Sequence, residues 1–241
     1  MGRNSLKIAI MQPTFFPWMG YFDLIDYVDT FVFLDSVQLA RRSWQVRNKI
    51  KVADSEYLFT VPIKKSANRN DLIIKDALFV DDHFKEKFFL LIQRSYKKAK
   101  YYDCLIEFVR QIILFDTPRL PTYNINIIQK ICQRLGITTS FLMASKIPEV
   151  NGKKGELIFN ICKKMNATTY VSPFGSRNYL EEKKDQFIKN DIAIFYQKYQ
   201  HPQYTQVGAT FISHLAIIDL LLNEGIEHSK QLIIKGRQYE K

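Results

Sequence analysis

Long uncharged apolar runs are missing from this 241-residue sequence, because charges interrupt even rich stretches such as residues 108–115. A membrane-spanning helix needs about 20 consecutive apolar residues, so no membrane span is expected. The start of the chain lacks the apolar core of a secretory signal, since Lys7 interrupts residues 6–11 and Gln12 and Pro13 follow. We interpret residues 7–11 as a first strand.

Cysteine is also scarce. The three thiols, Cys104, Cys132 and Cys162, are too far apart in sequence to form a zinc knuckle or a redox loop, and a reducing cytoplasm is the expected compartment. Each lies in a helix-like apolar pattern, which favours a buried, inert thiol. A nucleophilic role for Cys162 stays open, because it needs a depressed pKa. No two histidines have ligand spacing with Cys or carboxylates, so a catalytic metal is not indicated. No cofactor is expected either.

Glycine and proline are few, at 9 and 8 residues, which leaves little room for linkers or low-complexity segments. The composition, 46% hydrophobic and 24% charged, is that of a globular protein. Acidic residues are outnumbered 24 to 35 by Lys and Arg, giving a net charge of +11. This charge suits an anionic substrate or an acidic partner protein.

Short β-rich runs alternate with helical patterns at both ends of the chain. The predicted strands are residues 7–11, 30–34, 137–143, 168–172 and 192–196. The predicted helices are residues 20–28, 154–166, 179–188 and 213–223, the last closed by Gly225. This alternation predicts an α/β, Rossmann-like, mostly parallel sheet flanked by helices.

A helical insertion is predicted in the middle of the chain. Residues 82–115 favour two helices broken near Lys100, and residues 122–135 favour a third that stops at Gly136. Before them, residues 49–52, 57–63 and 72–79 have strand propensity and predict a small antiparallel excursion. We divide the chain into an N-terminal α/β part with ligand loops (1–80), a helical block (81–136) and a C-terminal α/β part (137–241), all in one compact unit.

Ligands of such sheets bind beyond the carboxyl ends of the strands. The loop after the first strand holds two prolines, and its Gly20 permits close backbone approach where a helix begins, so that a phosphate could bind there. Alternatively, its aromatic residues bury a rigid turn against the core. The candidate substrate-binding residues of this loop are Gln12, Trp18, Gly20 and Tyr21.

The second strand is followed by Asp35, a candidate catalytic residue, and then by a basic segment at residues 41–48. Guanidinium groups, an indole and side-chain amides can together hold a diphosphate and stack a base or sugar ring. The alternative is a solvated basic loop whose tryptophan fills a gap in the core. The candidate substrate-binding residues here are Ser43, Trp44, Arg47 and Asn48.

His201 follows the last confident strand and is the best general-base candidate of the four histidines. The other three histidines are interpreted as incidental. An exposed loop histidine with no catalytic role is the alternative. Further candidate substrate-binding residues at strand ends are Lys154, Ser172, Tyr204 and Gln206.

Several of these segments resemble the WbqC-like family: residues 8–22, 33–35, 43–50, 170–180, 201–206 and 215–225 match its blocks in order. The family is associated with gene clusters for O-antigen, lipopolysaccharide and other surface polysaccharides. The resemblance implies a transferase acting on a nucleotide-activated amino sugar, with transfer of an acyl or aminoacyl group from an acidic carrier protein's thioester to the sugar amine. A non-catalytic nucleotide-sugar or pathway-partner binding protein is the alternative.

Two departures from the family pattern limit what can be carried over. Met11 and Ala216 stand where many members have His and Ser, so a mechanism based on a histidine at position 11 does not apply here. The first loop also resembles the strand-to-helix turn of nucleotidylyltransferases, but residues 18–21 lack both signature histidines. Nucleic-acid binding is not expected, because no recognition motif accompanies the positive charge.

Overall fold

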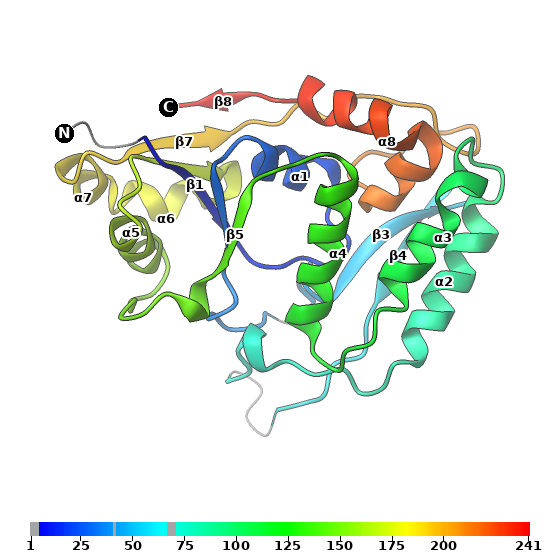
Figure 1. Cartoon of the computed structure of the whole chain (residues 1–241), viewed down its shortest axis with the longest axis horizontal. Coiled ribbons are helices and arrows are strands. Elements are labelled where there is room, and N and C mark those ends of the chain that lie inside the picture. Colours follow the sequence, from blue (N-terminus) through cyan, green and yellow to red (C-terminus); the bar gives the residue numbers. More distant parts are fainter. Residues whose placement is uncertain (1–4, 41, 67–70) are drawn as a thin grey trace.

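The core of the protein is a six-stranded sheet with strand order β5-β2-β1-β6-β7-β8 (Figure 1). The computed structural model describes residues 5–40, 42–66 and 71–241. Neighbouring strands are parallel except for the antiparallel pair β7–β8. The strands are β1 (Lys7–Met11), β2 (Thr30–Phe33), β5 (Ser140–Met143), β6 (Thr169–Pro173), β7 (Ala193–Gln197) and β8 (Tyr239–Glu240). The predicted α/β, mostly parallel sheet is confirmed.

Central strands are apolar on both faces because both faces are covered. In β2, Phe31 and Phe33 pack into one core cluster, whereas Val32 between them packs into the other. The first cluster lies under α1 (Met19–Asp26), α2 (His83–Tyr96), α3 (Tyr102–Ile113), α4 (Leu120–Arg134) and α8 (Ile217–Lys235). The second lies under α5 (Gly155–Lys164), α6 (Arg177–Glu181) and α7 (Lys184–Lys189).

An antiparallel hairpin of β3 (Arg47–Val52) and β4 (Ser55–Thr60) lies between α1 and the helices α2 and α3. Three single-turn 3₁₀ helices complete the fold: η1 (Ile74–Asp76), η2 (Ala144–Lys146) and η3 (Phe174–Ser176). Residues 72–79, predicted as a strand, form η1 and isolated bridges instead. Within the described ranges, no helix is long and apolar enough to cross a membrane.

The two glycines predicted to end helices behave differently. Gly136 adopts φ +66 directly after α4 and its C-cap residue, in the left-handed conformation that a glycine cap requires. Gly225 also adopts a left-handed φ, +73, but α8 resumes beyond it and continues to Lys235. A Cβ at Gly225 would lie against the Tyr101 ring. The prediction that the last helix closes at Gly225 was therefore wrong: the glycine makes a kink where α3 packs closely.

A buried carboxylate ties the end of the chain to α1. The fully buried Asp23 accepts hydrogen bonds from Arg237 Nε at 2.6 Å, from the Tyr239 hydroxyl at 2.8 Å and from Gln197 Nε2 at 2.8 Å. Arg237 also bonds to Asp26 at 2.5 Å, and the two carboxylates raise the pKa of its guanidinium. This network holds β8, the edge strand of the sheet, in place against α1.

We expect Arg237→Ala to lower the free energy of unfolding by about 2 kcal/mol, because Asp23 loses a charge-assisted hydrogen bond where water does not reach it. Urea unfolding measures the change. The matched control is Arg110→Ala, which removes an exposed pair with Glu107 at 3.5 Å and should cost under about 0.5 kcal/mol. Equal losses in the two variants would contradict the structural role of Asp23.

Candidate functional site

A cavity of about 300 Å³ lies at the carboxyl end of β1. The order of strands reverses here: the chain passes from β1 to β2 on one side, and later to β6 on the other. This crossover is where doubly wound sheets bind their ligands. The cavity, which we call the β1 cavity, is lined by Met11, Thr14, Trp18, Tyr21, Trp44, Asn48, Lys49 and His214.

The turn between β1 and α1 is held rigidly. Phe16 adopts φ +40, in the left-handed region, and its ring is fully buried. Asn48 Nδ2 donates to the carbonyls of Phe15 at 3.0 Å and of Phe16 at 2.7 Å, while the Tyr21 hydroxyl donates to the Gln12 carbonyl at 2.9 Å. Asn48 and Tyr21 thus shape the cavity through the backbone of the turn.

Gly20 serves the packing of Trp18. A Cβ at position 20 would overlap the six-membered ring of the indole, so only glycine lets that ring lie against the start of α1. The other side of Trp18 meets the rings of His201, 6.0 Å between centroids and nearly parallel, and of His214, at 4.8 Å. Trp18 is therefore clamped between the helix and a histidine pair. Phosphate binding at Gly20 stays a prediction.

Both ring nitrogens of His201 are occupied. The His214 backbone amide donates to Nε2 at 3.1 Å, so Nδ1 carries the hydrogen and donates to the Pro202 carbonyl at 2.9 Å. Burial and the neighbouring His214 lower the pKa of His201 to about 4. Its imidazole is neutral at pH 7, and proton transfer at Nε2 would require the His214 amide to move. A general-base role for His201 stays a prediction.

His214 is the histidine that lines the cavity, and sequence reasoning missed it. It adopts φ +58, its ring lies near Ser213 Oγ at 2.9 Å from Nδ1, and no described residue bonds to Nε2. Burial and the charge of Lys49 lower the pKa of His214. No periodicity or spacing in the sequence links this residue to the first loop, because their contact depends on the path of the 198–216 loop.

That loop is anchored on Asp219 in the first turn of α8. Asp219 is fully buried and accepts hydrogen bonds from the Tyr204 hydroxyl at 2.8 Å, Gln206 Nε2 at 2.9 Å and the Tyr96 hydroxyl at 2.9 Å. Burial outweighs these donors and raises the pKa of Asp219 to about 6. Tyr204 and Gln206 are not among the residues that line the β1 cavity; they fix the loop that carries both histidines.

A second anchor holds the tip of the same loop. Asp54, in the β3–β4 turn, accepts the backbone amides of Ala209 at 2.8 Å and Thr210 at 3.1 Å. The Nζ of Lys51, a buried residue of β3, donates to the Thr210 carbonyl and lies 3.4 Å from Asp54. The Asp54 pKa is lowered by the two amides first and by Lys51 after them.

The polar side chains of residues 43–48 form only some of the hydrogen bonds that they could form. Trp44 is 49% exposed at the cavity mouth, with the Arg47 guanidinium 5.7 Å from its ring. Gln45 Nε2 donates to Gln12 Oε1 at 2.6 Å, but Gln45 Oε1, Ser43 Oγ and Arg47 Nε are buried without a hydrogen-bond partner in the part of the chain that the structure describes. Buried polar atoms are costly when unpaired. A ligand or water bonding to them would remove that cost.

Comparisons of the sequence with known proteins identify its family. The WbqC-like family model matches residues 12–231. This chain belongs to the WbqC-like family. It is also 30% identical over 223 residues to the uncharacterized protein Rv1507c of Mycobacterium tuberculosis, covering 92% of this chain and 95% of that protein. No solved structure matches it.

Three further predicted site residues of this WbqC-like protein are not among the residues that line the β1 cavity. Asp35 follows β2, and its carboxylate accepts the Ser145 amide at 2.9 Å and hydroxyl at 2.5 Å. Lys154 is the N-cap residue of α5, and Ser172 is buried in β6 with its hydroxyl 3.3 Å from the Pro173 carbonyl. The structure thus brings Trp18, Tyr21, Trp44 and Asn48 together, with Gln12, Gly20 and Arg47 supporting or flanking them.

The three cysteines differ in their environment. Burial raises the pKa of Cys162 and of Cys132, so both thiols stay protonated and unreactive. The prediction that Cys104 is buried was wrong, because it lies on the exposed side of α3. Among the residues that are described, no group of three His, Cys, Asp or Glu side chains could hold a metal ion.

We expect the stability of the wild type, relative to His201→Gln, to rise with pH between about 4 and 6.5. In this window the unfolded imidazole binds a proton that the folded one, with its pKa about 4, does not. We expect a difference on the order of 2 kcal/mol, less than the shift alone would give, because solvent partly screens this half-buried group. Urea unfolding of both proteins at several pH values measures it. Parallel stability profiles would show that His201 is not buried as described.

Proposed function

We propose that this WbqC-like protein is a transferase of surface-polysaccharide (O-antigen) biosynthesis that moves an acyl or aminoacyl group from a carrier-protein thioester to the amine of a nucleotide-linked amino sugar. The observation that carries the proposal is the lining of the β1 cavity, where the imidazole of His214, the cation of Lys49 and two indoles meet at the sheet crossover. Indole faces suit a base or sugar ring, and cations suit a diphosphate.

The reaction needs one base, and it needs the sugar amine to be held close to the thioester carbonyl. His214 is the better placed histidine, because none of the described residues bonds to its Nε2, while Nδ1 bonds with Ser213 Oγ. The sugar amine attacks the thioester carbonyl, a C–N bond forms and the C–S bond breaks. The amine proton passes to His214 Nε2 and then to the departing sulfur, so an amide and a free thiol result.

Lys49 and His201 support this role of His214. Lys49 is paired with Glu56 at 2.6 Å, and its charge disfavours protonation of the neighbouring His214. His201 accepts the His214 amide and packs against its ring at 4.8 Å between centroids. In this proposal His201 is a positioning residue, and Trp44 and Arg47, at the mouth, contact the nucleotide.

A binding protein without catalysis is the second candidate. It is favoured by the engagement of the cavity's polar groups within the protein, since Asn48 holds the turn and Lys49 holds Glu56. A nucleotide-linked amino sugar would then raise the melting temperature without giving any product when a loaded carrier protein is supplied.

We expect His214→Gln to lower turnover of dTDP-amino sugar with acylated carrier protein at least about 100-fold, because proton transfer to a base is lost. Mass spectrometry of the sugar nucleotide measures product. The matched control is His228→Gln, which removes a half-exposed imidazole paired with Glu224 on α8 and should leave turnover unchanged. Full turnover by His214→Gln would refute the base assignment. Stabilisation by the sugar without product in the wild type would favour the binding protein.

A further inference from the structure

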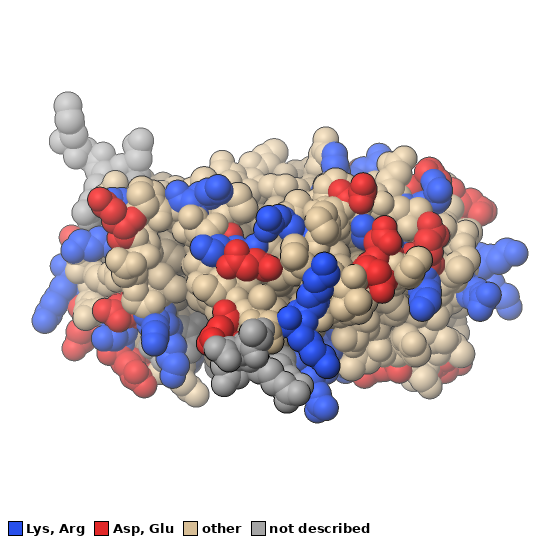
Figure 2. Space-filling view, turned by 90° about the horizontal axis from the view of Figure 1, so that it is seen from below, with Lys and Arg blue, Asp and Glu red and all other residues tan. Residues whose placement is uncertain are grey.

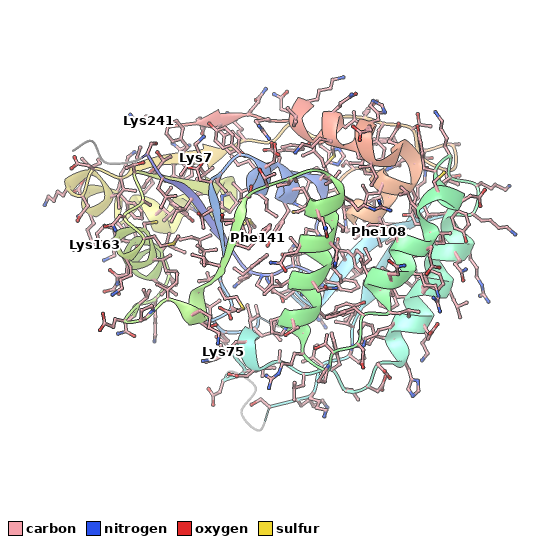
Figure 3. All side chains as sticks on the ribbon, in the orientation of Figure 1. Lys7, Lys75, Phe108, Phe141, Lys163 and Lys241 are labelled. Atoms are coloured by element: carbon pink, nitrogen blue, oxygen red, sulfur yellow. The ribbon has the colours of Figure 1, made fainter. Side chains whose placement is uncertain are left out.

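A second cavity lies beside the first on the same edge of the sheet. It has a volume of about 670 Å³, within the range of small-molecule sites. One wall is apolar and consists of Phe33 at the end of β2 and residues 141–143 of β5. We call it the β2–β5 cavity. In Figure 3, Phe141 and Lys75 mark its two sides, with η1 below β5.

The rim of the β2–β5 cavity is cationic. Lys75 of η1, Arg119 at the N-cap of α4 and Lys146 of η2 come from three separate elements and all line it. None of them forms an ion pair with any residue that the structure describes. Figure 2 shows this side of the molecule, with Lys and Arg side chains near the middle of the face and some Asp and Glu side chains among them.

The acidic residues at this cavity do not neutralise it. Asp35 is buried, and both of its carboxylate oxygens accept hydrogen bonds from Ser145. Asp76 is exposed on the rim and is the remaining acid of the lining. The fifteen-residue α4 also begins at this cavity, and its N-terminus adds partial positive charge. Three cations against two carboxylates leave the lining with a net positive charge, and the rim cations favour an anionic group on the ligand. The apolar wall favours a chain attached to that group.

The two cavities are neighbours by strand register. Met11 of β1 lines the first, and Phe33 of β2 lines the second; these residues are direct partners in the parallel pair. Both side chains pack on the same face of the sheet. Adjacent strands lie about 4.8 Å apart, so the two cavities lie at the ends of neighbouring strands.

We propose that the β2–β5 cavity binds the phosphopantetheine arm of the acyl donor, with the phosphate on Lys75, Arg119 and Lys146 and the chain along β5. This inference rests on the proposed function, since a carrier-protein thioester presents its acyl group on such an arm. The shared chemistry is a phosphate on a flexible chain. The diphosphate of the nucleotide sugar is another source of phosphate, and the experiment below separates the two.

The test is isothermal titration with 4′-phosphopantetheine, with pantetheine as the ligand that lacks only the phosphate. We expect Arg119→Ala and Lys75→Ala each to weaken phosphopantetheine binding about tenfold, the effect of losing one charged contact. Lys163→Ala on α5 removes an exposed cation on the other face of the sheet (Figure 3) and should bind like the wild type. Pantetheine should bind at least about tenfold more weakly than phosphopantetheine.

Three results would overturn the inference: no binding of phosphopantetheine, equal affinity for pantetheine, or equal affinity in Arg119→Ala, Lys75→Ala and Lys163→Ala. Binding of dTDP that depends on Arg119 and Lys75, without binding of phosphopantetheine, would assign the cavity to the nucleotide instead. Phosphopantetheine binding that depends on these residues without any sugar acylation would support the inference and refute the proposed function. Sugar acylation by Arg119→Ala with an unchanged KM for the carrier protein would support the proposed function and refute the inference.

Discussion

The hydrogen bonds to Asp219 are the interaction on which the site depends. A carboxylate that is fully buried costs free energy unless donors surround it, and here the donors come from α2 and from two positions of the 198–216 loop. Satisfying Asp219 therefore fixes the loop against α8. Because that loop carries His201 and His214, the hydrogen bonds to Asp219 determine which histidine rings face Trp18.

The turn after β1 imposes the complementary constraint from the other side. Its left-handed residue, Phe16, is held by the Asn48 amide on one side and by aromatic packing on the other. Asn48 is the second residue of β3 in the β3–β4 hairpin, and the carbonyl of the next residue, Lys49, accepts the amide of Ala216 just before α8. The turn, the hairpin and the loop are thus connected through main-chain atoms, and the β1 cavity is the space that these three segments enclose.

Sequence patterns predicted the helices and strands that can be recognised from their own residues. The apolar runs of β1 and β2 follow from burial on both faces, and Gly136 adopts the left-handed conformation beyond α4 that its position indicated. Gly225 shows the limit of this reasoning. At an apparent helix end, this glycine makes a kink within α8 instead of ending the helix. The position requires a glycine because the Tyr101 ring leaves no room for a Cβ, and no local sequence pattern reveals that contact.

For the candidate site, too, the sequence identified some residues correctly and could not reveal the role of others. Trp18 and Trp44 were predicted from their position after strands, and both line one cavity. Tyr204 and Gln206 have the residue types of a binding site, yet their polar atoms bond to Asp219, a partner 15 and 13 residues further along the chain. His214 is the opposite case, because nothing in its sequence neighbourhood distinguishes it from a surface histidine. Side-chain chemistry indicates what a residue can bind, whereas its actual partner depends on the path of the loop.

The strand register gives the clearest physical reason why two substrates would share this edge. Met11 and Phe33 are partners whose side chains lie on one face of the sheet, so the cavities above them keep a fixed spacing. Tyr21 packs against Phe31 at 5.4 Å, and Phe31 packs against Phe33 at 5.2 Å, which joins the wall of the β1 cavity to that of the β2–β5 cavity. If each cavity held one reactant, a rigid aromatic row between them would reduce the entropy lost in bringing the reactants together.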